Sequence, residues 1–323
     1  MIFADLNFKS HIHLKNFNFN YVSFRNCEFY IGFDISDTKI YGNILFDKVL
    51  FKNLNYIISF ENSILNEGIT IKNSEINSAI FINKTKIDNN FIIVDSIIIN
   101  DIIVDESEIY GCIEFERSKF LKICTFNNAK LFNKTKFDNA NFVNFVPDFR
   151  GASLHEATEF YGTKWPSPPE DIQSAQSQVS AYEHLRKEMD RLKRNNDEFM
   201  FLRKELRARR VLTQNLLVKF LDILYEFLSD YGSSIAKPMA WMGAILVLGT
   251  IIFCKAGLNF GTSLLFSLSN MFPFLPIGKD FIDKKELSHL SSPAEAFSIA
   301  QMVAGPILLF LLILAVRNMF KIR

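Results

Sequence analysis

The residues best placed to do chemistry in this sequence are uncharged polar side chains within apolar stretches near the C-terminus. Ser267, Ser269 and Asn270 interrupt one uncharged run, and Gln301 interrupts another. Hydroxyl and amide groups in such places can replace part of the hydration shell of a solute that crosses a membrane. The pattern therefore makes these four residues candidate lining residues of a pore, although small polar residues also simply let helices pack closely.

Gly305-Pro306 follows Gln301 in the same run. Proline removes one backbone N–H from a helix and disturbs the hydrogen bond of the preceding turn. The pair is therefore a candidate hinge for a gating movement.

Catalytic chemistry is not indicated. No Ser/His/Asp, Cys/His or paired-carboxylate arrangement recurs at a plausible site, so we expect neither an enzyme nor a cofactor. His11 and His13 could share one face of a strand, but two ligands alone are weak evidence for a metal, and surface histidines are the favoured interpretation. The four scattered cysteines indicate neither a disulfide framework nor a zinc site.

Two uncharged runs predict the elements that must hold the polar residues. Residues 238–254 and 297–316 are 17 and 20 residues long, enough to cross a hydrocarbon core of about 30 Å. Residues 262–277 contain prolines and polar side chains, which favour a short re-entrant segment over a third crossing. Basic residues flank the outer ends of the pair, so we expect residues 233–323 to form a lipid-contacting domain of the inner (cytoplasmic) membrane with both termini in the cytoplasm.

The N-terminal half carries an 11-residue repeat. Small residues recur at this spacing, each followed two positions later by a large apolar residue, and a second apolar set follows eight positions after the small one. Residues 63–145 hold fifteen Ser, Thr, Ala or Cys, and eight of them lie on the eight in-phase positions, where chance would place about one or two. The in-phase small residues are Ser63, Ser74, Thr85, Ser96, Ser107, Ser118, Ala129 and Ala140.

Eleven is also the period of right-handed helical coils. Short alternating triplets, many β-branched residues and asparagine-rich breaks argue against a helix here. Each repeat instead predicts short extended pieces, with small and large apolar side chains inward and charged ones outward. Two repeats, about 22 residues, would make one four-sided coil, and residues 1–163 would make about seven coils.

The repeat resembles the pentapeptide-repeat family, whose members wind into a right-handed quadrilateral β-helix. The resemblance is clearest in Ala4-Asp5-Leu6, Ala129-Lys130-Leu131, Ala140-Asn141-Phe142 and Ala152-Ser153-Leu154. The alternation of five and six residues departs from the strict period of five that is commonest in the family. We expect a β-helix over residues 1–165, ended by the proline-rich segment Trp165-Pro166-Ser167-Pro168-Pro169.

A helical connector is predicted over residues 170–232. Asn195-Asn196 should break it into a hairpin, with Asp197 as the N-cap of the second helix. Interleaved charges predict ion pairs on a solvated face near anionic lipid rather than a nucleic-acid site. An amphipathic helix should follow, with Leu217, Phe220, Leu221, Leu224, Phe227 and Leu228 on one stripe.

The order of span, short polar segment and span is similar to the two-transmembrane ion-channel plan. The block LLFSLSNMFPFLP with Gln301, Gly305-Pro306 and Leu314–Asn318 is similar to membrane proteins that join pentapeptide repeats to a channel-like domain, over about Tyr225–Arg323. The potassium-channel filter sequence TVGYG is absent, so the resemblance does not imply potassium selectivity.

Three functions follow as hypotheses. The first is a homo-oligomeric pore, possibly a tetramer, with a cytoplasmic β-helical assembly or sensing domain, because two spans from one chain cannot enclose water. The second is a membrane-anchored scaffold that binds a cytoplasmic protein on the β-helix and conducts nothing. The third, imitation of DNA to inhibit a topoisomerase, is disfavoured because residues 1–163 carry 16 Lys and Arg against 20 Asp and Glu, too little negative charge. No nucleic-acid partner is expected.

Overall fold

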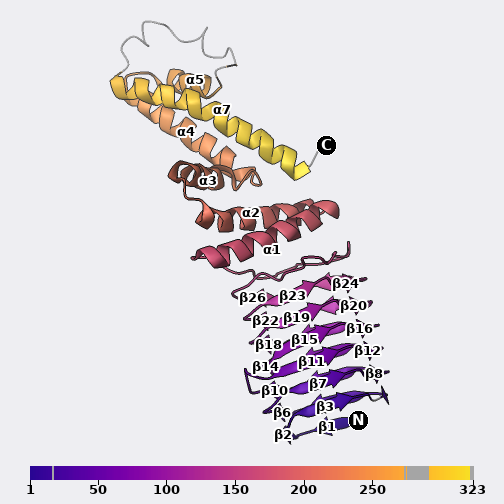
Figure 1. Cartoon of the computed structure of the whole chain (residues 1–323). Helices are drawn as coiled ribbons and strands as arrows, with labels where there is room; N and C mark the ends of the chain where they lie inside the picture. Colours follow the sequence, from indigo (N-terminus) through magenta and orange to yellow (C-terminus); the bar gives the residue numbers. More distant parts are fainter. Residues whose placement is uncertain (17, 273, 275–290, 321–323) are drawn as a thin grey trace. The chain divides into compact units, whose positions relative to one another are not determined.

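The computed structural model describes residues 1–323 except 17, 273, 275–290 and 321–323 (Figure 1). The chain divides into two compact units, Met1–Leu212 and Thr213–Arg323. The first contains 26 described β-strands, α1 (Ile172–Arg191) and α2 (Asn195–Leu212). The second contains α3 (Leu216–Ser229), α4 (Ala236–Lys255), α5 (Phe260–Met271) and α7 (Ser292–Phe320).

The strands form four parallel sheets that are the faces of a β-solenoid. One seven-stranded sheet contains β1 (Ile2–Ala4), β5 (Val22–Arg25), β9 (Ile44–Asp47), β13 (Ile69–Lys72), β17 (Phe91–Val94), β21 (Ile113–Glu114) and β25 (Thr135–Lys136). The other contains β2 (Asn7–Phe8), β6 (Glu28–Phe29), β10 (Leu50–Phe51), β14 (Glu75–Ile76), β18 (Ile97–Ile98), β22 (Lys119–Phe120) and β26 (Asn141–Phe142). One six-stranded sheet contains β3 (Ile12–Lys15), β7 (Phe33–Ser36), β11 (Ile57–Glu61), β15 (Ala79–Asn83), β19 (Ile102–Asp105) and β23 (Cys124–Asn127). The last contains β4 (Asn18–Phe19), β8 (Lys39–Ile40), β12 (Ile64–Leu65), β16 (Lys86–Ile87), β20 (Glu108–Ile109) and β24 (Lys130–Leu131).

The register confirms the predicted coil of two repeats. Ile69 pairs with Phe91 and Ile80 pairs with Ile102, so equivalent residues of successive turns are 22 apart. Regular strands end at Phe142 and give about six turns rather than the expected seven. Isolated bridges such as Lys136 with Glu159 and Asn141 with Lys164 continue the stacking beyond them without forming strands.

The interior is filled as the repeat predicts. The in-phase small residues and the large apolar residues two positions later are buried in the described structure. Aromatic rings stack along the axis, for example Phe29 on Phe51 with ring centroids 4.3 Å apart. Because neighbouring turns supply the contacts of each ring, the core is continuous along the solenoid.

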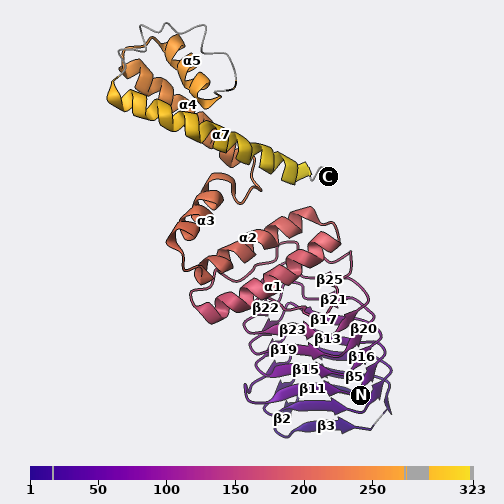
Figure 2. The same cartoon turned by 45° about the horizontal axis from the view of Figure 1, so that its top comes forward.

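The helical hairpin of α1 and α2 packs on the last turn of the solenoid (Figure 2). Trp165 ends the repeats and packs between Phe142 and Phe201, with ring centroids 5.8 and 5.1 Å away. The hairpin is confirmed, but its predicted break is wrong. The chain reverses at Leu192–Arg194, where Lys193 takes a left-handed conformation (φ 56°), and Asp197 lies inside the first turn of α2 as an ion-pair partner of Arg194 rather than as its N-cap.

The second unit consists of apolar helices that expose much of their surface. Two described helices, α4 and α7, are long and apolar enough to cross a membrane and contain the two predicted spans. Only 22% and 28% of their most apolar windows are buried. α5 covers the first part of the predicted re-entrant segment, whose residues 273 and 275–277 lie outside the described structure.

Candidate functional site

The candidate site is a cluster of polar side chains among α4, α5 and α7. α5 begins after Asn259, whose side chain caps the helix by accepting a hydrogen bond from the Thr262 amide at 2.9 Å. Its 12 residues span about 18 Å, which is shorter than a hydrocarbon core. Ser263, Ser267 and Asn270 recur at helical spacing on its buried face, so α5 turns its polar groups toward its two neighbours.

Gln301 of α7 is the centre of this polar cluster and is almost fully buried. Its Nε2 donates to the Ser267 hydroxyl at 2.7 Å and to the Ile245 carbonyl of α4 at 3.1 Å. The Ser267 hydroxyl donates in turn to the Leu246 carbonyl at 3.2 Å. One amide and one hydroxyl therefore tie three helices together.

Asn270 extends the network. Its Nδ2 donates to the Ser298 hydroxyl at 2.9 Å and lies 3.4 Å from Gln301 Oε1. The sequence-predicted residues Ser267, Asn270 and Gln301 are thus brought together. Ser269 is half-buried and lies off their stripe. Ser298 was not among the predicted residues, although it precedes Gln301 by one helical turn.

Two glycines let the helices approach at this cluster. A side chain at Gly249 would collide with Ser267 and Gln301, and one at Gly305 would collide with the backbone of Met271 at the end of α5. α7 continues through Pro306 without interruption. Gly305, predicted as part of a hinge, therefore contributes a close helix contact in this structure.

The network contains no ionisable group among its described members. Its hydroxyls and amides can orient a neutral solute or a partly dehydrated ion, but they cannot perform acid–base chemistry at neutral pH. Within one chain, the Gln301 amide already donates to the Ser267 hydroxyl and to the Ile245 carbonyl, and the Ser267 hydroxyl donates to the Leu246 carbonyl.

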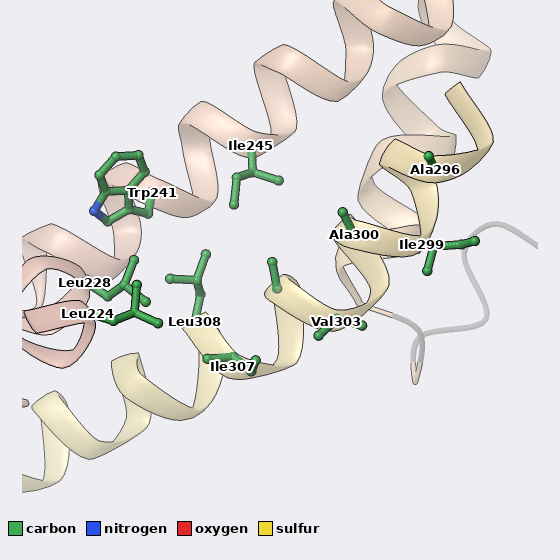
Figure 3. A pocket seen from close by; sticks show the side chains of 11 residues that line it. Leu224, Leu228, Trp241, Ile245, Ala296, Ile299, Ala300, Val303, Ile307 and Leu308 are labelled. Atoms are coloured by element: carbon green, nitrogen blue, oxygen red, sulfur yellow. The ribbon is translucent and has the colours of Figure 1, made fainter. Parts of the chain in front are cut away.

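An apolar groove of about 570 Å³ lies between α3, α4 and α7 (Figure 3). Leu224 and Leu228 of α3 face Trp241 and Ile245 of α4 across it, and the alanines of α7 line one wall. Almost no polar atom reaches its surface. Such a groove suits hydrocarbon and does not suit a water-soluble ligand.

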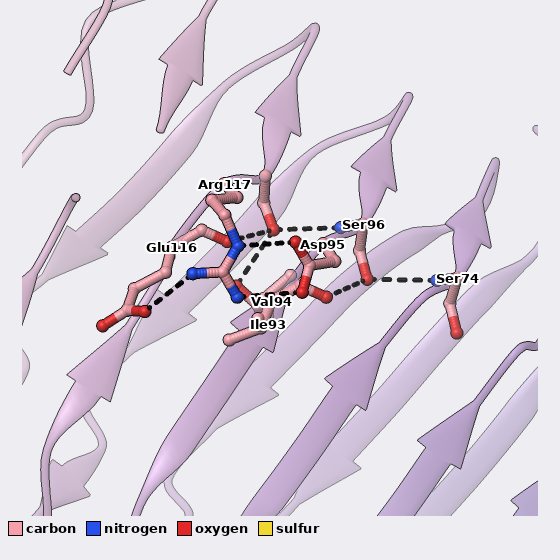
Figure 4. Close-up of polar contacts among 8 residues, drawn as sticks. Ser74, Ile93, Val94, Asp95, Ser96, Glu116 and Arg117 are labelled. Carbon is pink, nitrogen blue, oxygen red and sulfur yellow. Dashed lines mark hydrogen bonds and ion pairs between the residues drawn. The ribbon is translucent and has the colours of Figure 1, made fainter. Parts of the chain in front are cut away.

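The solenoid offers a second candidate surface, which is built on buried hydroxyl ladders. We name Thr38, Ser63, Thr85 and Ser107 the first ladder, and Ser74, Ser96 and Ser118 the second. In each, a backbone amide donates to the hydroxyl one turn further on; Ser74 N donates to Ser96 Oγ at 3.2 Å and Ser96 N to Ser118 Oγ at 3.1 Å (Figure 4). The ladders replace backbone pairing at two corners of the coil, which explains why serine or threonine occupies most of the in-phase positions there.

The residue before each in-phase small residue has positive φ. Thirteen described non-glycine residues of the solenoid have positive φ, with values between 46° and 56°, and nine of them are Asn or Asp, which tolerate this left-handed conformation. The thirteen are Asp5, Asn16, Asn26, Asp37, Lys48, Asn62, Asn73, Lys84, Asp95, Glu106, Arg117, Asn128 and Asn139. The asparagine-rich breaks in the sequence mark these left-handed positions.

Charges on the outside of the solenoid pair between turns. Arg117 holds Asp95 of the preceding turn through two hydrogen bonds of 2.7 and 2.9 Å, which lowers the pKa of that carboxyl group (Figure 4). Lys130 likewise pairs with Glu108 at 2.7 Å, and this contact raises the pKa of the lysine. These exposed pairs contribute little stability individually. They leave the surface with alternating rather than uniform charge.

Within the described residues no group of three or more His, Cys, Asp or Glu is arranged to hold a metal ion. His13 is instead paired with Asp34. Comparison with known proteins found no matching family model, no matching curated protein and no matching solved structure.

Proposed function

We propose that the chain forms a homo-oligomeric, channel-like pore in the cytoplasmic membrane, with the β-solenoid as a cytoplasmic assembly or sensing domain. The observation that carries the proposal is the polar cluster of Ser267, Asn270, Ser298 and Gln301 inside a unit whose outward surface is apolar. Polar side chains are costly in lipid and mark pathways more often than chance.

The short helix α5 supports the same proposal. It packs on both α4 and α7 and is too short to cross a bilayer alone, which is the arrangement expected of a re-entrant segment. The exposed apolar residues of α4 and α7 would face lipid or neighbouring subunits. We also propose that the solenoid is a quadrilateral β-helix of the pentapeptide-repeat type and that it is joined to a two-span, channel-like domain. Both ends of the chain would then lie in the cytoplasm.

A membrane-anchored scaffold is the second candidate, and one observation favours it. Ser267 and Gln301 satisfy their hydrogen bonds inside a single chain, so the unit needs no aqueous lumen to stabilise them. In that case α4 and α7 only anchor the chain, and a cytoplasmic protein binds the paired charges of the solenoid.

The two candidates differ in whether water reaches the membrane unit. In a cysteine-free version of the full chain, reconstituted in liposomes, Ser269→Cys tests a half-buried position of α5 that the sequence predicts to line a pore, and Val247→Cys, which is exposed on the apolar surface of α4, is the matched control. A pore predicts ion flux, an oligomer by native mass spectrometry, and modification of the cysteine at 269 by a charged thiol reagent at least tenfold faster than at 247, with block of the flux. A monomer without flux, or equal modification at both positions, would support the scaffold.

A further inference from the structure

Helix α3 exposes two adjacent apolar stripes. Successive members of each stripe are three or four residues apart, so each stripe follows one side of the helix. Leu217 and Phe220 are 66% and 62% exposed, and of the 14 residues of α3, all of them described, only Ser229 is buried. Water against so large an apolar surface is unfavourable, so the surface requires a partner. The outer stripe contains Leu216, Phe220, Ile223 and Phe227, and the groove stripe contains Leu217, Leu221, Leu224 and Leu228.

The charged side of α3 is held by the turn that follows the helix. Lys219, Asp222 and Glu226 occupy the side that the two stripes leave free. The Tyr231 hydroxyl donates to Asp222 at 3.2 Å and lies 3.4 Å from a carboxylate oxygen of Glu226. Residues 230–232 have φ values of 50°, 58° and 72°, a left-handed run that separates α3 from α4. α3 is therefore an independent helix with a charged side and an apolar side, not an extension of the first predicted span.

Two hydrogen bonds locate α3 beside one end of each membrane-length helix. Lys237 Nζ, in the first turn of α4, donates to the Glu226 carbonyl at 3.2 Å. Asn318 Nδ2, in the last turn of α7, donates at 3.0 Å to the Gly232 carbonyl in the turn after α3. α3 therefore lies beside the start of α4 and the end of α7. If both helices cross a bilayer, these two ends lie on the same side of it.

The same ends carry the residues that mark a bilayer boundary. The two predicted spans stop at Lys237 and Arg317, and charged residues that flank spans lie among the headgroups. Trp241 packs on Phe227 with ring centroids 4.8 Å apart, and tryptophan is enriched at this depth. A helix at this depth can place one side in hydrocarbon and the other in water.

The apolar groove between α3, α4 and α7 continues the surface of α3. Leu224 and Leu228 of the groove stripe face Trp241 and Ile245 across it (Figure 3). The stripes therefore join the exposed apolar surface of the two long helices through the groove. Acyl chains can fill such an irregular surface, whereas a second copy of the chain would have to match its shape.

We propose that α3 lies along the boundary between headgroups and acyl chains of a phospholipid leaflet, with both stripes among the acyl chains and the charged side toward water. The inference rests on the proposed membrane location of the second unit, but not on conduction. α3 carries one Lys against one Asp and one Glu, so it has no basic excess that would draw it to anionic lipid. Its insertion should therefore be the same in vesicles of phosphatidylcholine with and without phosphatidylglycerol.

Nitroxide labels can measure the surroundings of each side of α3. In a cysteine-free version of the full chain, reconstituted in these vesicles, Leu217→Cys and Phe220→Cys carry the label on the two stripes. Lys219→Cys carries it on the charged side and is the matched control. Oxygen concentrates in hydrocarbon, and a water-soluble nickel chelate is excluded from it. The ratio of oxygen to nickel collision rates at positions 217 and 220 should exceed the ratio at position 219 by about fivefold or more.

Each other occupant gives a different result. Equal ratios at all three positions would mean that water covers the stripes, and would overturn the proposal. Low collision rates with both reagents at the stripes, together with spin–spin broadening, would assign the surface to a second copy of the chain and would overturn it as well. Circular dichroism identifies a labelled variant that fails to fold, and the other stripe position then decides.

Ion flux through the same vesicles separates this proposal from the proposed pore. Flux with water-exposed stripes would remove the interfacial helix and leave the pore. Lipid-exposed stripes without flux would support the interfacial helix and favour the anchored scaffold. A chain that a carbonate wash removes from the vesicles would overturn both.

Discussion

Each hydroxyl of the second ladder both accepts and donates. Ser96 Oγ accepts from Ser74 N and donates to the Val94 carbonyl at 2.8 Å. In the first ladder, the Thr85 hydroxyl likewise accepts from Ser63 N at 3.4 Å and donates to the Asn83 carbonyl at 3.0 Å. We therefore expect Ser96→Thr to be nearly neutral. Ser96→Val, whose side chain is isosteric with that of threonine, should be less stable by about 1–3 kcal/mol, because the Ser74 amide loses its acceptor. Urea denaturation followed by circular dichroism compares the two, and equal midpoints would show that the ladder is not a stabilising element.

The positive φ of the corner residues predicts a substitution that should stabilise the solenoid. Glu106 has φ 46°, a conformation that costs an L-residue about 1–2 kcal/mol and that asparagine adopts more readily. Glu106→Asn should therefore raise stability by about 0.5–1 kcal/mol in the same denaturation assay. Glu75→Asn, at an exposed strand position, is the control and should give no gain, since asparagine is disfavoured in strands. A larger gain at position 75 would contradict the explanation.

Lys204 should titrate in the accessible range. Its pKa is lowered from 10.5 to about 8, so between these pH values the unfolded chain holds a proton that the folded protein has lost, and stability rises with pH. At pH 8 the neutral amine should react with an acylating reagent faster than Lys130, whose pKa is raised by Glu108. Mass spectrometry of the labelled peptides measures both rates. Measured over a series of pH values, a labelling midpoint for Lys204 that is no lower than the midpoint for Lys130 would exclude the lowered pKa.

At the scale of elements, two glycines of the second unit give a matched pair. Gly305→Ala would place a methyl group against the Met271 backbone and should separate α5 from α7, at a cost of about 1–3 kcal/mol. Gly243→Ala adds the same group to α4 where no atom lies within 4 Å, and should be neutral or slightly stabilising because alanine favours helices. Thermal unfolding in detergent measures both. Equal effects would mean that Gly305 is not a packing contact.

Local periodicity was sufficient to predict the solenoid, since each repeat specifies its own inward and outward residues. The number of turns was not predictable in the same way, because regular strands end where the flanking sequence stops pairing and where Trp165 and the hairpin cover the last turn. The reversal at Lys193 was misplaced because Asn195-Asn196 resembles a break, although the structure uses a left-handed lysine two residues earlier.

The polar cluster of the second unit could be predicted only in part. Polar residues in apolar runs identified Ser267, Asn270 and Gln301, but their partners lie 21 to 56 residues away in sequence and depend on helix packing. Nothing local distinguished Ser269 from Ser267. Helical spacing separates them only once the buried face of α5 is known.

At the scale of the whole molecule, the chain joins two units with different demands on their surroundings. The solenoid and its hairpin bury one continuous core and pair their outer charges, as a water-soluble body does. The second unit exposes large apolar side chains on α3, α4 and α7. Their burial in lipid or in an oligomer would contribute about 25 cal/mol for each Å² removed from water.

This division predicts the products of cleavage between the units. A protease site inserted at Thr213–Gln214, next to the boundary at Leu212, should allow complete cleavage in membranes, because these residues lie between α2 and α3 and are in neither helix. The N-terminal fragment should then be released into buffer with a β-rich circular-dichroism spectrum. The C-terminal fragment should stay in the pellet after a carbonate wash, since α4 and α7 expose most of their apolar surface. A C-terminal fragment that carbonate extracts would rule out both the pore and the anchored scaffold, whereas an N-terminal fragment retained by the pellet would place a membrane contact on the solenoid unit itself.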